Sequence, residues 1–348
     1  MNEMKDLEQD PVELFEQVAE LIEAARHSVI RTTNVTMVTT YFLIGKSIVE
    51  YEQSGKIRAE YAKSTLKNLS VSLKKRYGKG YSEDNLSNMR RFYSVYSISE
   101  NYSRKLSNSH NSQIELPNFR LSWSHYLFLC RLKSSEERRF YEIEAAQNYW
   151  NLDELKRQFN AALYERLILS ADKERVKELS THGQIIKQPK DLIKDPYILE
   201  FLGLEDKPEY SETEFETAII NKIENFILEL GKGFFFGGRQ VRFTFNEKHY
   251  RIDLVFYNRL LKCFVLIDLK IGSLTHEDLG QMQMYVNYYD RYLKNDDEHP
   301  TIGIIICKDK DDAVVEITLP EGNNQIFAAQ YQLYLPSKEE LRQLIDNA

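Results

Sequence analysis

The spacing of apolar residues changes character along this chain, and that change limits the folds it can adopt. Up to about residue 170, long segments carry apolar residues at helical spacing. After Gly231, runs rich in β-branched and aromatic residues dominate and are interrupted by single helices. A length of 348 residues exceeds one typical core and suits two domains. The sequence therefore predicts a helical domain followed by an α/β domain.

We place the helical domain at residues 1–170, a charged linker at 171–194, and the α/β domain at 195–348. A stretch rich in Ser and Asn, residues 97–118, is expected to be a flexible loop or linker. The helical patterns of the first domain cover residues 12–27, 37–53, 59–77, 121–132, 135–147 and 152–169, with one more helix after Ser82, a candidate N-cap.

The helix at 59–77, a glycine turn at 78–80 and the helix after Ser82 have the outline of a helix-turn-helix, although a plain helical hairpin has the same pattern. The formal net charge of −7 argues against a protein that coats nucleic acid indiscriminately. Residues 56–91, however, carry ten Lys or Arg against three acidic residues, so this window is +7 and the rest is −14. We expect it to contact nucleic acid through Lys74, Lys75, Arg76, Lys79, Arg90 and Arg91.

The second domain is expected to be an α/β layered structure, in which the apolar strand 263–269 is central. The other expected strands are at 234–245, 250–257, 301–307, 314–317 and 326–334. The expected helices are at 212–230, at 276–293 and after Pro336.

Two ionisable residues end the apolar run CFVLIDLK, where the pattern predicts a buried core. Residues two apart in a strand point to the same face, so Asp268 and Lys270 should project together. Asp253, in RIDLVFY of the preceding strand, is a second carboxylate in apolar surroundings. If Leu260 and Leu261 form a tight turn, residue 253 pairs across from 268, with Cβ atoms roughly 4.5–5.5 Å apart.

Two carboxylates that close repel each other unless a cation lies between them. The arrangement suits Mg²⁺ or Mn²⁺ bound by Asp253, Asp268, the backbone carbonyl of Leu269 and water. Such an ion would polarise a phosphate oxygen and activate water, while Lys270 would position that water or offset charge in the transition state. The spacing thus predicts phosphodiester hydrolysis; the alternative is an Asp–Lys ion pair beside an unrelated Asp.

These residues also resemble a known signature. Asp253 and Asp268-x-Lys270 resemble the PD-(D/E)xK nuclease motif, with Ile252 in place of the proline, and Gln281-x-x-x-Tyr285 resembles the QxxxY element of the RecB-like branch. The segments GKGFFFGGRQ, RIDLVFYNRLLKCFVLIDLK and GIIICKDKDD resemble the bacterial DUF1016 (YhcG-like) family, as do TYFLIGKSIVEYEQ, YGKGYSEDNLSNMRRFY and LSWSHYLFL in the helical half. The resemblance covers nearly the whole chain.

This resemblance implies a restriction-endonuclease-like C-terminal domain, a central mixed sheet flanked by helices, behind a helical DNA-binding domain. DNA is the favoured substrate, and roles near mobile elements or in phage defence are suggested. The superfamily usually adds a glutamate from the first helix of the nuclease domain. Glu216 is the candidate, because it shares the apolar arc of that helix, whereas Glu224 and Glu229 lie to its sides.

Four further side chains are expected near the site. Gln281 and Tyr285, four residues apart on one helical face, are expected to contact the substrate or the region of Lys270. Arg239 and Gln240, just before the strand of Asp253, could hold the phosphate backbone or equally satisfy the sheet edge.

We expect a cytoplasmic protein. The composition is 42% hydrophobic and 28% charged, no apolar run approaches the roughly 20 residues of a membrane span, and the N-terminal residues do not resemble a secretory signal. The three cysteines form no CxxC pair and are expected to be reduced. Two rival functions stay open: a catalytically silent nucleic-acid-binding or assembly protein, and a toxin-like RNase. Homo-oligomerisation is open as well.

Overall fold

The computed structural model describes residues 11–54, 59–97, 118–170, 173–204 and 210–335. The chain divides into two compact units, residues 1–152 and 153–348. The predicted helix after Pro336 and nearly all of the predicted loop at 97–118 lie outside the described residues. None of the helices in these ranges combines the length and hydropathy needed to cross a membrane.

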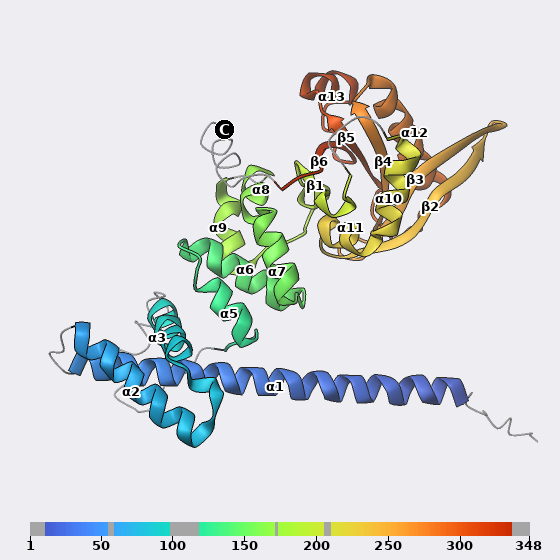
Figure 1. Cartoon of the computed structure of the whole chain (residues 1–348). Helices are drawn as coiled ribbons and strands as arrows, with labels where there is room; N and C mark the ends of the chain where they lie inside the picture. Colours follow the sequence, from blue (N-terminus) through green and yellow to red (C-terminus); the bar gives the residue numbers. More distant parts are fainter. Residues whose placement is uncertain (1–10, 55–58, 98–117, 171–172, 205–209, 336–348) are drawn as a thin grey trace, which may run out of the picture. The chain divides into compact units, whose positions relative to one another are not determined.

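The described part of the first unit is helical, as predicted (Figure 1). One helix spans the two predicted segments at 12–27 and 37–53. The intervening residues contain no Gly or Pro that would end the helix, and within it Thr36 Oγ1 donates to the carbonyl of Thr32 at 2.9 Å. The elements are α1 (Pro11–Ser54), α2 (Ala59–Tyr77), the 3-10 turn η1 (Lys79–Tyr81), α3 (Glu83–Ser97), α5 (Trp123–Leu129) and α6 (Ser135–Gln147).

Ser82 caps α3 as predicted, because the backbone N–H of Asn85 donates to Ser82 Oγ at 3.2 Å. The helix-turn-helix outline is therefore present. α3 buries Leu86, Met89 and Phe92 and packs tightly on α1 at Gly45, where an added Cβ would lie 2.1 Å from the carbonyl oxygen of Met89. Only glycine permits this approach of the two helices.

The second unit contains a six-stranded mixed sheet in the order β1-β6-β5-β4-β3-β2. β1, β6, β5 and β4 are parallel neighbours, and β4, β3 and β2 are antiparallel. The apolar strand β4 is central, as predicted. The strands are β1 (Tyr197–Ile198), β2 (Phe234–Phe245), β3 (Lys248–Asn258), β4 (Cys263–Ser273), β5 (Ile302–Asp309) and β6 (Ile326–Gln332).

Helices cover both faces of this sheet (Figure 1). On one face, α10 (Glu212–Asn221) and α11 (Ile223–Leu230) bury Phe215 and Phe226 against Leu254 and Ile267. On the other, α12 (His276–Tyr292) buries Leu279 and Met282 against Leu266. The sheet is stabilised by burial of apolar surface on both faces, which contributes about 25 cal/mol per Å² buried.

One predicted strand is wrong. Residues 314–317 belong to the helix α13 (Asp312–Thr318), which Asp311 caps by accepting from the N–H groups of Ala313 and Val314. Val314 and Val315 pack on the core, whereas Ile317, on another side of this short helix, is 88% exposed.

Two predicted helices are interrupted. The helix expected at 212–230 breaks at Lys222, which separates α10 from α11. The helix expected at 152–169 breaks at Ala162, whose φ is 49°, which separates α7 (Leu152–Asn160) from α8 (Leu163–Ser170). Neither break coincides with a Gly or Pro, so residue type gave no signal for it.

The segment 171–194 is not the simple linker that we predicted. It contains α9 (Lys173–His182) and the 3-10 turn η2 (Pro189–Leu192). Leu192 and Ile193 belong to the core under the sheet, and Lys194 is buried. The compact second unit accordingly starts at residue 153, so that α8 and nearly all of α7 are grouped with the sheet.

Candidate functional site

The site lies where the β2–β3 hairpin leaves the rest of the sheet. Residues 254–258 of β3 pair with β4, whereas residues 248–252 pair with β2 alone. Asp253 lies at the point where β3 separates from β4, which we call the fork of the sheet. The pair Leu254–Ile267 places residue 253 next in register with Asp268, as the predicted turn required. Beyond the fork, β4 continues beside β5, with Asp268 opposite Ile305.

The buried Asp268 and the half-buried Lys270 form the ion pair of the site, at 3.1 Å between Oδ2 and Nζ. Asp253 is held by the backbone, because the N–H of Leu269 donates to its Oδ2 at 2.8 Å. Burial, followed by the nearby charge of Asp253, raises the pKa of Asp268 to about 7, although Lys270 opposes the shift. Burial alone would lower the pKa of Lys270, but the carboxylate of Asp268 outweighs it and raises that pKa.

Gln240 links two carboxylates of the site. Its Nε2 donates to Glu216 Oε2 at 2.6 Å and to Asp253 Oδ1 at 3.0 Å. Its backbone has a φ of 48°, a left-handed conformation that is costly for a residue with a side chain and recurs at functional sites. The amide of Gln240 thus lies between two carboxylates, and its contact with a phosphate stays a prediction.

Glu216 lies on α10 and is 6% exposed. Burial raises its pKa, the hydrogen bond from Gln240 opposes that shift, and the charge of Asp253 adds to it. The structure thus links the predicted glutamate to Asp253, with Gln240 as the bridge.

Glu229 departs from the predicted helical phase, since it is fully buried rather than at the side of the helix. Arg166 of α8 pairs with it, at 2.6 Å between Nη1 and Oε1, and the N–H of Ile198 donates to it at 2.9 Å. The break at Lys222 resets the phase of α11, so one angle of 100° per residue cannot describe both helices. Glu229 is therefore structural, and Glu224 is exposed.

The donor set fits a divalent cation in part. Asp253 and Asp268 provide two adjacent carboxylates, and the side chain of Asp268 is buried. Carboxylate oxygens are suitable ligands for a hard cation such as Mg²⁺. In the described part of the chain, no group of three or more His, Cys, Asp or Glu side chains is arranged to hold a metal ion. The amide of Gln240 stands between Glu216 and Asp253. Glu216 can join the two aspartates as a ligand only if that amide moves.

Gln281 and Tyr285 lie together on α12, as predicted, and the amide of Gln281 donates to the hydroxyl of Tyr285. That hydroxyl donates to the carbonyl of Arg251 at 2.8 Å, two residues before Asp253. Burial raises the pKa of Tyr285 to about 12. A cavity of about 420 Å³ opens here, lined by Arg242, His249, Tyr250, Arg251, Gln281 and Tyr285.

Two acidic residues near Lys270 escaped the sequence analysis. Asp278 Oδ1 lies 3.7 Å from Lys270 Nζ, and Glu212 Oε1 lies 4.0 Å from it. Asp278 also completes a capping box with Thr275 at the start of α12. The Thr-x-x-Asp pattern directly after the strand of Lys270 was the available signal.

The basic window lies in the first unit. Lys74, Lys75, Arg76, Lys79 and Arg91 are exposed, and Arg239 is exposed on β2 of the second unit. Arg90 differs, since its Nη1 pairs with Glu52 at 2.9 Å. This ion pair partly neutralises the charge of Arg90 within the helical unit.

Comparison with protein families matches both halves of the chain. Residues 190–346 match the family described as the YhcG PDDEXK nuclease domain, and residues 17–166 match the DUF1016 N-terminal domain. A curated relative is "Putative nuclease YhcG" of Escherichia coli (strain K12), 36% identical over 346 residues that cover 94% of this chain and 92% of the relative. The predicted resemblance and the restriction-endonuclease-like fold of the sheet unit are confirmed.

Two solved structures show weaker likeness. A repair endonuclease from Pyrococcus abyssi is 18% identical with a TM-score of 0.25, over 37% of this chain and 50% of that chain. The structure of an EndoMS-dsDNA2 complex is 16% identical with a TM-score of 0.26, over 37% of this chain and 46% of that chain. The chain thus spans about half of each of these two structures. The family assignment rests on the two family matches and on the curated relative.

Proposed function

The chain belongs to the DUF1016 (YhcG-like) family of PDDEXK nucleases, and from this membership we propose that it hydrolyses phosphodiester bonds of DNA with the help of Mg²⁺ or Mn²⁺. The reacting groups are Asp253, Asp268 and Lys270. The observation that carries this proposal is the pair of adjacent carboxylates at the fork of the sheet, one of them 3% exposed. A fold gains nothing in packing from such a pair.

Each side chain has a role that follows from its place. Asp253, aligned by the N–H of Leu269, and Asp268 present two oxygens to one point. Lys270 is held beside Asp268 with a raised pKa, so it stays charged and can donate to a phosphate oxygen that gains charge. A divalent cation bound by the aspartates would neutralise them and polarise the phosphate.

Glu216 and Gln240 form the side of the site that would rearrange when a cation binds. The Gln240 amide satisfies Glu216 and Asp253 through its hydrogen bonds at 2.6 and 3.0 Å. Rotation of that amide frees an oxygen of each carboxylate. We expect Gln281 and Tyr285, at the adjoining cavity, to position the substrate strand.

Two other functions are alternatives that a cleavage assay distinguishes from the proposed one. A catalytically silent binding or assembly protein would have lost pressure to retain the charged residues, yet Asp253, Asp268 and Lys270 are all present. A toxin-like RNase would use the same carboxylates on RNA. The exposed basic side chains of α2 and η1 suit the backbone of either polymer.

The deciding experiment is a cleavage assay with the full chain. Plasmid, single-stranded DNA, branched DNA and RNA are each incubated with Mg²⁺, with Mn²⁺ and with EDTA. We expect cation-dependent cleavage of at least one DNA substrate. Cleavage of RNA alone would establish the RNase, and binding without cleavage of any substrate would establish the silent protein.

A further inference from the structure

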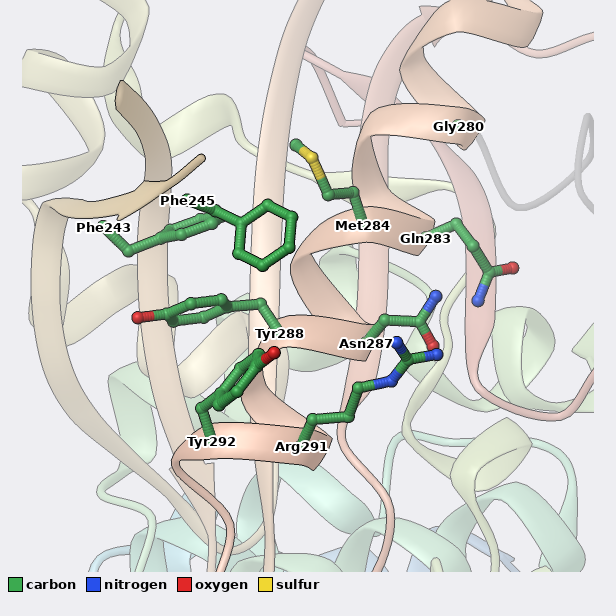
Figure 2. Close-up of a pocket in the computed structure, with 9 residues that line it drawn as sticks. All are labelled: Phe243, Phe245, Gly280, Gln283, Met284, Asn287, Tyr288, Arg291 and Tyr292. Carbon is green, nitrogen blue, oxygen red and sulfur yellow. The ribbon is translucent and has the colours of Figure 1, made fainter. Parts of the chain in front are cut away.

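An aromatic groove lies beside the carboxylate site, between the end of β2 and the outer side of α12. Its volume is about 290 Å³, close to the lower end of the range for small-ligand sites, about 300 Å³. Figure 2 shows the side chains that line it: Phe243, Phe245, Gly280, Gln283, Met284, Asn287, Tyr288, Arg291 and Tyr292. Nothing in the preceding mechanism uses these residues.

The rings form a cluster, with one stacked pair at its buried end and tilted rings at its exposed end. Phe243 and Tyr288 are stacked at 4.1 Å between ring centroids with planes 23° apart. Tyr292 follows at 5.2 Å from Tyr288, and Phe245 lies 6.4 Å from Tyr292. Phe245 is 48% exposed and Tyr292 is 61% exposed. Clustered aromatic faces left open to water mark binding surfaces, and flat ligands extend such a stack favourably.

Polar groups stand at the rim of the same groove. In Figure 2 the amide of Asn287 and the guanidinium of Arg291 lie beside each other, and Gln283 is one turn earlier on α12. Side-chain amides donate to and accept from the edges of nucleobases. Arginine pairs with phosphate and also stacks on a base. The lining therefore combines the groups that recognise a nucleotide.

The groove and the cavity beside the candidate active site meet at one pair of packed rings. The ring of Phe243 lies edge-on to that of Tyr285, at 5.6 Å. Tyr285 also lines the cavity next to Asp253, together with the exposed Arg242 and Arg251. A strand whose phosphate reaches the carboxylates would pass these two arginines and bring a neighbouring base to the rings.

We propose that this groove binds an unpaired base of a DNA strand, next to the phosphodiester bond held at Asp253 and Asp268. The inference rests on the proposed function and deepens it, because it names the substrate class: DNA that is single-stranded or locally unpaired near the cut. A base paired in a duplex has both faces covered by its neighbours and cannot reach the rings. Stacking of bases on protein aromatics is tolerant of sequence, so we expect little sequence preference from this groove.

The test measures binding in EDTA, where no cleavage is expected. A single-stranded oligonucleotide that contains 2-aminopurine reports stacking through quenching of its fluorescence. We expect Tyr292→Ala and Phe245→Ala to reduce the quenching and to weaken binding about 5- to 100-fold, whereas Tyr292→Phe retains both. Phe235→Ala is the matched control, because Phe235 is a 57% exposed aromatic residue at the other end of β2.

Three results would overturn the proposal. These are unchanged quenching and affinity in both alanine variants, equal loss in Phe235→Ala, or a change of oligomeric state on analytical ultracentrifugation, which would assign the groove to a second copy of the chain. Equal or tighter binding of an RNA oligonucleotide would contradict the choice of DNA.

Two further outcomes distinguish the groove from the proposed function. If the wild type binds the oligonucleotide and quenches its fluorescence but never cleaves, the proposed function fails and the groove proposal stands. If Tyr292→Ala cleaves single-stranded DNA as the wild type does, the groove fails while the function stands.

Discussion

A carboxylate with a pKa near 7 is the feature at residue scale that most needs an explanation. Asp268 is 3% exposed and faces Asp253, so the ionised form costs free energy in the absence of a compensating charge. Lys270 provides one positive charge for these two carboxylates. A bound cation would remove the remaining penalty, which is why metal affinity and stability should be coupled at this residue.

This coupling predicts a pH dependence for the metal-free protein. The pKa of Asp268 is 3.8 when unperturbed and about 7 in the fold, so between those values the folded state binds more protons. The contribution of Asp268 to stability is then fully present below about pH 4 and is lost as the pH rises through 7. Asp268→Asn should therefore be more stable than the wild type at pH 8, with the difference shrinking by pH 5. Urea unfolding of both proteins in EDTA measures it, and parallel pH profiles would disprove the shift.

Glu216 and Glu229, both buried, should respond differently to substitution. Glu216→Gln should raise the Mg²⁺ concentration needed for cleavage and leave the fold intact, because its hydrogen-bond partner is a neutral amide, that of Gln240, and not a buried charge. Glu229→Gln should leave that concentration unchanged but lower stability by about 3–5 kcal/mol, since it breaks a buried pair with Arg166. Glu224→Gln is the exposed control. Cleavage against Mg²⁺ concentration and thermal melts decide it; a raised Mg²⁺ requirement in Glu229→Gln would exclude our assignment.

At the scale of elements, the close approach of α1 and α3 depends on one glycine. Alanine is the better helix former by about 1 kcal/mol, so Gly45→Ala would stabilise an isolated α1. In the fold its Cβ would meet the Met89 carbonyl at 2.1 Å, and we expect a net loss of about 1–3 kcal/mol. Gly80→Ala, with nothing within 4 Å of the added Cβ, should be nearly neutral. Urea unfolding of the full chain compares them, and equal stabilities would show that the helices can separate at no cost.

How far the sequence predicts each element depends on whether its signal is local. The strand of Asp268 and its register with Asp253 were predictable, because a short turn and a period of two determine both. The break at Lys222 and the left-handed backbone of Gln240 were not, because tertiary contacts impose them on residues with no such preference. α13 was mistaken for a strand because a seven-residue segment is too short to distinguish the two periods.

The same limit applies to the site. Asp253, Asp268 and Lys270 were chosen from residue type and spacing, and Glu216 was chosen by helical phase after the family resemblance implied a glutamate on this helix. The bridging role of Gln240 could not be predicted, because it depends on the meeting of α10 with the β2–β3 hairpin. The aromatic groove was likewise hidden, since Phe243 and Tyr288 are 45 positions apart and join only through packing.

At the scale of the whole molecule, an acidic chain with net charge −7 concentrates many exposed basic side chains in one window of the helical unit. We predict that replacing Lys74, Lys75, Arg76 and Lys79 by Ala weakens DNA binding and flattens its salt dependence, by about one unit of slope for each phosphate that is no longer neutralised. Lys222→Ala with Arg259→Ala, exposed residues of the other unit, is the control. Titration at several salt concentrations measures the slopes, and an unchanged slope would leave the window as a solvated helical surface.

The central claim is that the carboxylates at the fork of the sheet bind a cation and cleave a phosphodiester bond. The most direct measurement compares Asp268→Asn with the wild type in Mg²⁺-dependent cleavage and in thermal melts with Mg²⁺ and with EDTA. We predict that the wild type cleaves and that Mg²⁺ raises its melting temperature, whereas the variant folds, loses about a hundredfold or more in activity, and shows a smaller shift. Cleavage by Asp268→Asn at the wild-type rate, or a wild-type melting temperature that Mg²⁺ does not change, would contradict the account.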